Sequence, residues 1–278
     1  MLQRRWPLLL CLLALAAPSA LAQEAVSARL GSRPIPTAMP AGRRDLLLDK
    51  LVAAYPDFLA GHAGDALVWR DGTKTPVFDG RPAKTPAQLV ETPDIEDVFA
   101  WRYPLADQPI TTPAGDPGRV RPAALFTRMY GDCHAGQVTR NLVKVRWVDG
   151  TMLPFTRVNG ADQALAAVVK DLAALGPAYR QYLTPSAGTY NCRAIAGTAL
   201  TSMHAYGAAI DLNVRYSAYW EWSDKAAHGL ATYKNQIPAA IIQAFERHGF
   251  IWGGRWADFD TMHFEYRPEI IAVARAGG

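Results

Sequence analysis

The 278-residue chain has only three cysteines, no marked excess of one charge and no long apolar segment after its first residues. No later stretch approaches the roughly 20 continuous apolar residues that a transmembrane helix needs. We find no internal repeat and no low-complexity tract. Half of the residues are hydrophobic and 19% are charged, which is typical of a globular protein long enough to bury a sizeable core.

The charge balance gives little indication of a nucleic-acid partner. The 29 basic residues, against 25 acidic ones, include Arg4 and Arg5, so removal of residues 1–22 would leave a balance of 27 to 25. The isoelectric point near 9.0 therefore carries little information. No basic patch is interleaved with aromatic residues, and we expect no nucleic-acid binding.

The N-terminus has the three parts of a secretory signal. A basic start precedes an apolar run over residues 6–17, and Ala20-Leu-Ala22 provides a small-x-small cleavage site. We predict a signal peptide over residues 1–22, which leaves 278 − 22 = 256 residues. The mature protein is expected to be periplasmic or secreted and to have no membrane anchor. A lipoprotein anchored at Cys11 is the alternative, but the large residues Leu8 to Leu10 before it disfavour lipoprotein cleavage.

Removal of Cys11 leaves Cys133 and Cys192, an even count in an oxidising compartment, and we predict a disulfide between them. The bridge would close a loop of about 60 residues and pin the segment ten residues before Ser202. The alternative is that Cys133 and His134 bind a metal. Disulfide formation competes with that role, and no Cys-x-x-Cys spacing supports it.

The sequence predicts four regions: the signal peptide, a mobile leader at 23–43, an N-terminal region of unknown role at 44–122, and the main domain at 123–278. The N-terminal region ends in a Pro/Gly-rich linker or surface loop at 111–122. Apolar periodicity and turn residues predict helices over residues 46–55, 162–176 and 238–248, and strands over 66–69, 76–78, 140–148, 209–214 and 262–266. Without regular βαβ spacing, this order indicates an α+β fold with a small, mostly antiparallel sheet flanked by helices.

Two separate stretches carry residues suited to a metal. His204 lies seven positions before Asp211, across a turn that contains Gly207, and His263 lies near the C-terminus. A catalytic zinc takes three such ligands and keeps a fourth position for water. Asp211 points to the strand face opposite its apolar neighbours, and a divalent cation would offset the cost of burying its carboxylate.

Hydrolysis of an amide also needs a base for the proton of the attacking water. Asp260, three residues before His263, is the candidate, provided that the chain turns before the strand begins. Glu265 is the competitor because it shares a strand face with His263. The other role open to Glu265 is to hold the imidazole of a metal ligand.

These motifs resemble the zinc D-alanyl-D-alanine carboxypeptidase family, which includes vancomycin-resistance D,D-peptidases and the L-alanyl-D-glutamate endopeptidases of phage endolysins. The resemblance rests on Ser202-x-His204-x-x-Gly207-x-Ala209-x-Asp211, on Trp252-Gly-Gly-x-Trp256 and on Asp260-x-Met-His-Phe-Glu265, and extends more weakly over residues 124–266. It implies a hedgehog/DD-peptidase-like fold with a smaller N-terminal region before it. It also implies a Zn²⁺ site and peptidoglycan stem peptides as substrates.

Carried over residue by residue, the resemblance makes His204, Asp211 and His263 the zinc ligands and Asp260 the general base. Arg193 matches the arginine that binds substrate or stabilises the oxyanion, and Ser202 a serine that positions substrate. Many relatives have glutamate where this chain has Asp260, which is shorter by one methylene group.

Several alternatives stay open. Arg193 could be a surface arginine and Ser202 a turn or capping residue. A wall-binding module that kept the zinc but lost turnover is the alternative function, although such a module has no need of Asp260. We expect a monomer. Most of the four tryptophans near the motifs, and the histidines outside them, are interpreted as structural: Trp220, Trp222, Trp252, Trp256, His62, His134, His228 and His248.

Overall fold

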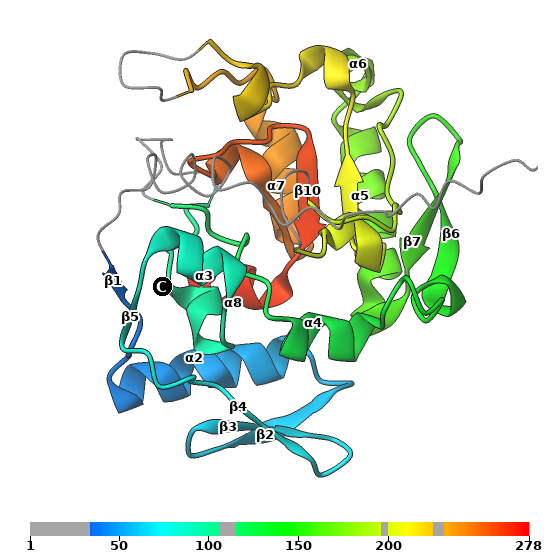
Figure 1. Ribbon diagram of the computed structural model, residues 1–278. Coiled ribbons are helices and arrows are strands. Elements are labelled where there is room, and N and C mark those ends of the chain that lie inside the picture. The colour runs from blue at the N-terminus through cyan, green and yellow to red at the C-terminus, as the bar shows by residue number, and fades with distance from the viewer. Residues whose placement is uncertain (1–33, 106–114, 196–199, 225–230, 278) are drawn as a thin grey trace, which may run out of the picture.

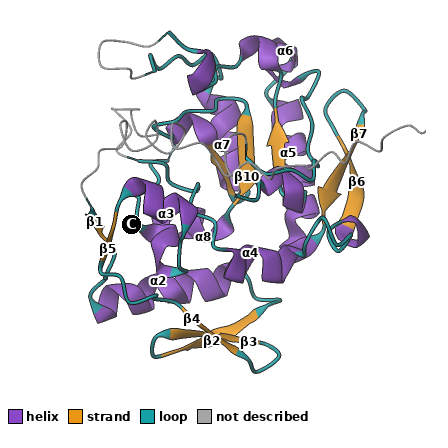
Figure 2. Cartoon of the chain, viewed as in Figure 1, coloured by secondary structure: helices purple, strands orange, loops and turns teal. Residues whose placement is uncertain are grey.

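The computed structural model describes residues 34–105, 115–195, 200–224 and 231–277. The predicted signal peptide and most of the predicted leader lie outside these residues. The α+β class is confirmed, because the described residues form seven helices and small antiparallel sheets (Figure 2). Order begins before the expected Arg44, since residues 35–36 already form a strand and a helix begins at Ala41.

The N-terminal region is built around one long helix, α2, with a three-stranded sheet of order β2-β3-β4 beside it (Figure 1). The predicted strand at 66–69 is found as β3, and β1 pairs with β5. The elements up to the predicted boundary are β1 (Ile35–Pro36), α2 (Ala41–Ala54), β2 (Leu59–Ala63), β3 (Ala66–Trp69), β4 (Lys74–Pro76), β5 (Ala83–Lys84) and α3 (Pro86–Glu91).

The rest of the chain forms a β6-β7 hairpin, a three-stranded sheet of order β8-β10-β9, and helices around them. The predicted helices at 162–176 and 238–248 are found as α5 and α7. The elements are α4 (Ala123–Tyr130), β6 (Leu142–Arg146), β7 (Met152–Thr156), α5 (Ala161–Ala174), α6 (Arg180–Leu183), β8 (Ala209–Asp211), α7 (Ala239–Arg247), β9 (Phe250–Trp252), β10 (His263–Tyr266) and α8 (Pro268–Arg275).

The central strand β10 separates two hydrophobic cores. Phe264 belongs to the core that contains α5, α7 and the β6-β7 hairpin, and its ring stacks on Phe245 of α7 at 3.9 Å. His263 and Glu265 alternate with Phe264 and therefore point to the other face of the sheet. Ala209, which pairs with Glu265, belongs to a second core that includes α2, α4 and α8. The N-terminal region thus covers the face that carries His263 and Glu265.

A chain of buried polar contacts crosses between the two regions. Tyr55, at the end of α2, donates to Oε2 of Glu269 (2.7 Å), and Oε1 of the same carboxylate accepts from Nε of Arg267 (2.6 Å). Nη1 of Arg267 donates in turn to Glu265 (3.0 Å). All three charged side chains are 0% exposed. An ionic chain without solvent needs partners at every link, so α2 helps to hold β10 in place.

The Pro/Gly-rich segment expected to act as a linker packs tightly where it is described. Residues 115–118 are buried, and Trp256 donates through Nε1 to the carbonyl oxygen of Pro117 (2.6 Å). Gly118 has φ +102°, and a Cβ there would lie 2.1 Å from Cδ1 of Ile251. Only glycine permits both that backbone conformation and so close an approach. The position of the domain boundary stays a prediction.

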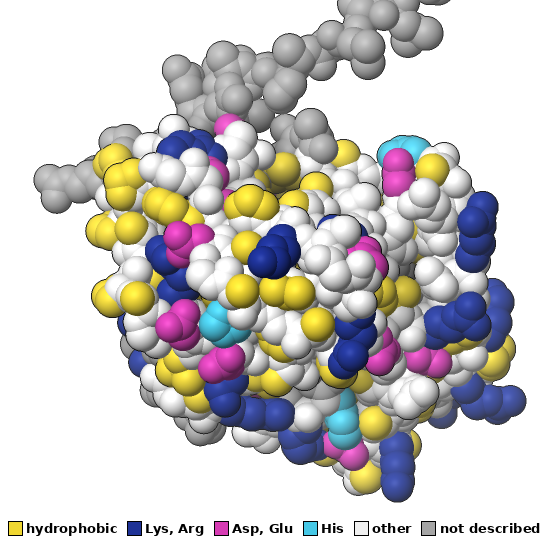
Figure 3. Space-filling view, turned by 90° about the horizontal axis from the view of Figure 1, so that it is seen from below, with side chains coloured by type: hydrophobic (Ala, Val, Ile, Leu, Met, Phe, Trp, Pro, Cys, Tyr) yellow, Lys and Arg dark blue, Asp and Glu magenta, His cyan; other side chains and the backbone are white. Residues whose placement is uncertain are grey.

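The surface carries both signs of charge. Figure 3 shows one face, on which basic and acidic side chains are interspersed with apolar ones. Among the described residues, no helix combines the length and the apolarity required to cross a membrane.

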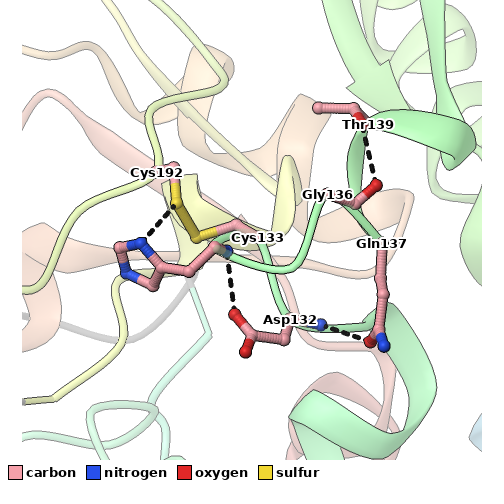
Figure 4. Close-up of a disulfide and its surroundings, with 7 residues drawn as sticks. Asp132, Cys133, Gly136, Gln137, Thr139 and Cys192 are labelled. Carbon is pink, nitrogen blue, oxygen red and sulfur yellow. Dashed lines mark hydrogen bonds between the residues drawn. A yellow bond between two sulfur atoms is a disulfide. The ribbon is translucent and has the colours of Figure 1, made fainter.

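The predicted disulfide is present. Cys133, in the loop after α4, is bonded to Cys192, and the two residues are 59 positions apart in sequence (Figure 4). Both sulfur atoms are therefore used, although these residues also lie within metal-ligand distance of His134. Nδ1 of His134 lies 3.6 Å from Sγ of Cys192. The bridge ties the segment that precedes Arg193 to the end of α4.

We expect the double substitution Cys133→Ser and Cys192→Ser to lower the free energy of unfolding by about 2–4 kcal/mol, because the unfolded chain loses a cross-link. Denaturant titration of the oxidised wild type and the variant measures the difference. In dithiothreitol the two proteins should unfold at the same midpoint. Equal midpoints under oxidising conditions would contradict a stabilising bridge.

Candidate metal centre

His204 is fixed by a short capped turn. It lies in the 3₁₀ segment Met203–Tyr206, and the hydroxyl of Ser202 accepts from the backbone N–H of His204 (3.3 Å). Gly207 ends the turn with φ +68°, and a Cβ there would lie 2.5 Å from Cδ2 of Leu142. Ser202 is therefore the capping residue of this turn, which is one of the two roles open to it. The turn leads directly into β8 and points His204 toward Asp211.

Asp211 and His263 are cross-strand partners. They lie directly opposite each other at the end of the antiparallel β8-β10 pair. Residues in such positions have neighbouring Cβ atoms on the same face of the sheet. The neighbours Ile210 and Leu212 are buried in the core on the other face, as the sequence pattern predicts. The register of two strands therefore brings together ligands that are 52 residues apart.

Three acceptor atoms converge on one point. Nε2 of His204 lies 3.2 Å from Nδ1 of His263, and Oδ1 of Asp211 lies 3.2 Å and 3.0 Å from these two nitrogens. Bond lengths of about 2.0–2.2 Å at tetrahedral angles would separate zinc ligands by roughly 3.3 Å. The triangle therefore fits a tetrahedral ion that keeps one position for a fourth ligand.

The outer nitrogen of each imidazole is held by a second partner. Nδ1 of His204 donates to the carbonyl oxygen of Thr189 (2.6 Å), and Nε2 of His263 donates to Oε2 of Glu265 (2.9 Å). These bonds leave the lone pairs of both inner nitrogens directed at the shared point. A metal ion that replaces the proton on Nδ1 of His263 would bind both inner nitrogens and the carboxylate oxygen, which supports a metal at this place.

Charge around the triangle favours a cation as well. Burial by itself would lower the pKa of His263, but hydrogen bonds to Asp211 and Glu265 outweigh burial and raise the pKa to about 9. Burial would raise the pKa of Asp211, yet His204 and His263 hold it well below its usual range. The site therefore retains positive charge even without a metal, because carboxylates surround it.

Glu265 forms hydrogen bonds with neighbouring side chains and is not among the residues that line the cavity. Its carboxylate is 0% exposed, and it bonds with Arg121 and Arg267 in addition to His263. Burial would raise the pKa of Glu265, but Arg121 and His263 lower it far below its usual range. A carboxylate with three such partners has little basicity to offer a water molecule. This geometry supports the role of ligand holder for Glu265.

Asp260 lines the cavity beside the triangle. Within the described part of the chain, its Oδ1 atom is buried and has no hydrogen-bond partner. Burial raises the pKa of Asp260 to about 6, with Asp211 adding to the rise and His263 opposing it. The turn expected before β10 is present, since the backbone N–H of His263 donates to the Asp260 carbonyl oxygen (3.3 Å). A carboxylate with such a pKa can both accept and donate a proton near neutral pH.

The triangle opens into a cavity of about 440 Å³, a size typical of small-molecule sites. Arg193 and Ser202 both line it, so the structure brings together every predicted site residue except Glu265, which lies behind His263. Arg193 is exposed, and its Nη1 donates to the carbonyl oxygen of Ala194 (3.2 Å). The cationic head thus lies at the mouth of the cavity.

Sequence reasoning missed other parts of the site. Arg119 and Arg121 line the cavity from the presumed linker, and Tyr219 lines it from the loop after β8. The alternation Arg119-Val-Arg121, with Val120 buried, could have indicated an extended segment with two arginines on one face. Trp252 and Trp256 are core residues as expected, whereas Trp222 is 62% exposed at the cavity rim.

The side chains that converge here, two histidines and a carboxylate with Asp260 in the same cavity, are of the types that can hold a metal in hydrolases. Residues 196–266, which are 71 of the 278 in the chain, match the family model described as D-alanyl-D-alanine carboxypeptidase. The match confirms the family resemblance that the motifs predict, and it supports a peptidase. No curated protein and no solved structure matches the chain.

We expect Glu265→Gln to weaken zinc binding by about 10- to 100-fold, because the amide holds His263 less firmly and no longer compensates Arg121 and Arg267. Competition with a chromophoric chelator measures the affinity. Glu269→Gln is the matched control, since it changes an equally buried carboxylate one link further from the site. An equal loss of affinity in both variants would contradict a specific role for Glu265.

Proposed function

We propose that this protein is a secreted zinc metallopeptidase that hydrolyses an amide bond in the stem peptide of peptidoglycan. One observation carries the proposal: three converging acceptor atoms line the same cavity of about 440 Å³ as Asp260, whose Oδ1 has no hydrogen-bond partner among the described residues. The family match supports peptide hydrolysis. The apparent secretory signal in the sequence agrees with an extracytoplasmic substrate and a periplasmic or secreted location.

His204, Asp211 and His263 would hold the zinc ion. Zinc in this position would polarise the scissile carbonyl and lower the pKa of a water molecule toward neutrality. The chain supplies what else the reaction needs. Glu265 and the Thr189 carbonyl fix the orientation and tautomer of the two imidazoles, so that their inner nitrogens stay free of protons.

Asp260 acts as general base and then as general acid. Its free Oδ1 takes a proton from the attacking water as the new carbon–oxygen bond forms. The same proton passes to the amide nitrogen as the carbon–nitrogen bond breaks, so the leaving group departs as a neutral amine. The pKa near 6 suits both halves of this transfer. The shorter aspartate is accommodated because Asp260 lies in the wall of the cavity itself.

Arg193 has the charge and the position to stabilise the oxyanion that develops on the carbonyl oxygen. The disulfide at Cys192 restrains the backbone directly before it. Ser202 holds the turn that carries His204 and lines the same cavity, where its side chain can position substrate. Each motif residue that lines the cavity thus has a proposed role in the same reaction.

A zinc-stabilised wall-binding module without turnover is the second candidate. It would use the same metal ligands and cavity but would have no use for a buried carboxylate oxygen without a partner. Asp260 is the carboxylate with such an oxygen that also lines this cavity among the described residues, and a role in the reaction would explain why it is kept there, so we favour the enzyme. A zinc-loaded wild type that binds sacculi but releases no product from any muropeptide would favour the binding module.

We expect Asp260→Asn to bind zinc with unchanged stoichiometry and to lose about 10²- to 10⁴-fold in kcat, because an amide cannot accept the proton. Mass spectrometry of muropeptide digests measures the rate and identifies the bond. Asp224→Asn, a change of an exposed aspartate, is the control and should cleave at the wild-type rate. Wild-type turnover by Asp260→Asn would remove Asp260 from the mechanism.

Removal of metal by a chelator should abolish hydrolysis, and added zinc should restore it to the wild type. His263→Ala should stay inactive after the same addition, since only two ligands remain. Metal content and activity are measured on the same samples. Full activity in metal-free wild type would refute the zinc mechanism.

A further inference from the structure

The segment before α4 contributes a wall of the cavity. Arg119 and Arg121 both line it, while Val120 between them is buried in the core. The segment is fixed from several sides: Arg267 donates to the carbonyl oxygens of Gly118 and Val120, and Asp258 donates from its backbone N–H to Oδ1 of Asp116 (3.0 Å). These contacts fix the backbone from which the two arginine side chains extend into the cavity.

The two arginines do different things. Arg121 is 8% exposed and bonds with the carboxylate of Glu265, so its charge is used in holding His263. Arg119 is 15% exposed, and its Nη1 atom lies 3.8 Å from Oδ2 of Asp258. Its Nη2 donates to the carbonyl oxygen of Asp258 (3.1 Å). Arg119 thus lines the cavity with its charge partly balanced by the nearby Asp258 and Asp116, whereas Arg121 bonds directly to the carboxylate of Glu265.

Arg119 is positioned close to the reacting groups. Its guanidinium lies 5.0 Å from the ring centre of Trp256, and that ring lies 5.4 Å from the ring of His263. Stacking on an aromatic face orients the plane of a guanidinium while its N–H edge stays available. The charges of Arg119 and Asp260 also influence each other directly. Arg193, by contrast, lies next to Ser202: the backbone N–H of Ser202 donates to the carbonyl oxygen of Arg193 (3.3 Å).

We propose that Arg119 binds a free carboxylate on the substrate residue whose amine leaves. The proposal rests on the proposed peptidase function and names the feature that the cavity recognises. A guanidinium matches a carboxylate through paired, charge-assisted hydrogen bonds. With Arg193 beside the turn of His204 and Arg119 beside Trp256, the cavity offers one cation for the oxyanion and another for the leaving residue.

The chemistry of both candidate bonds fits this requirement. In D-Ala-D-Ala the leaving residue carries the terminal α-carboxylate. In L-Ala-D-Glu the leaving D-Glu continues the stem through its side-chain carboxyl group, and its α-carboxylate is free. In each case the carbon next to the departing nitrogen bears a carboxylate. Arg119 would therefore recognise the carboxylate that both candidate substrates share.

The test uses two matched pairs of synthetic peptides. One pair ends in D-Ala-D-Ala as the acid or the C-terminal amide, and the other contains L-Ala-γ-D-Glu with the α-carboxylate free or amidated. The zinc-loaded wild type should favour the acid by roughly 10- to 100-fold in kcat/KM, the size expected for one charge-assisted pair. The pair that is cleaved identifies which of the two bonds is the substrate.

Arg119→Gln should lower kcat/KM for the acid much more than for the amide, so that the preference for the acid is lost; the amide should change only as far as the lost charge alters Asp260. Arg119→Lys, which keeps the positive charge but lacks the paired N–H donors of a guanidinium, should retain part of the preference for the acid. Arg128→Gln is the matched control, because Arg128 also stacks on a tryptophan, Trp69 at 4.0 Å, but lies outside the cavity. A loss of equal size for acid and amide in Arg119→Gln would show a merely structural role and overturn the proposal.

A binding measurement separates this proposal from the proposed function. Calorimetry on zinc-loaded Asp260→Asn, with and without Arg119→Gln, compares the affinities for acid and amide without turnover. Tighter binding of the acid that is lost in Arg119→Gln supports carboxylate binding by Arg119. If the wild type hydrolyses neither peptide, that result refutes only the proposed function. Hydrolysis with no acid preference, or no binding of either acid, refutes the role of Arg119.

Discussion

Three acceptor atoms held within 3.2 Å of one another are the constraint on which this structure depends. The fold keeps these atoms together because both imidazoles are also held through their outer nitrogens. Glu265 is the more demanding of the two supports, since a fully buried carboxylate costs several kcal/mol without partners. Arg121 and Arg267 provide these partners, and they come from opposite sides of β10 in sequence.

This requirement explains why the N-terminal region packs so closely on the main domain. The ionic chain from His263 through Glu265, Arg267 and Glu269 ends at Tyr55 of α2. Apolar contacts between α2 and α8 accompany it, and Figure 1 shows these helices side by side. The region thus has a physical role toward the site even though its sequence carries no recognisable motif.

The sequence predicted the parts that depend on local pattern. Helices α5 and α7 follow from apolar periodicity, and the spacing of His204, Asp211 and His263 indicated a metal set that the strand register then brings together. The roles of Arg119 and Arg121 could not be predicted, because they depend on packing between segments over a hundred residues apart. The Pro/Gly composition of 111–122 is shared by exposed linkers and by segments such as 115–118 that dock through their backbone. Composition alone does not distinguish the two.

The pairing of Asp211 with His263 has a consequence for how such a protein can diverge. Because two adjacent strands fix Asp211 and His263, the loop between β8 and α7 can change in sequence without moving these residues. That loop supplies Tyr219 and Trp222, whose rings meet edge to face at 5.5 Å beside the cavity. Part of the cavity rim is therefore encoded apart from the strands that carry Asp211 and His263. Selection can alter what enters the cavity while the reaction inside it stays the same.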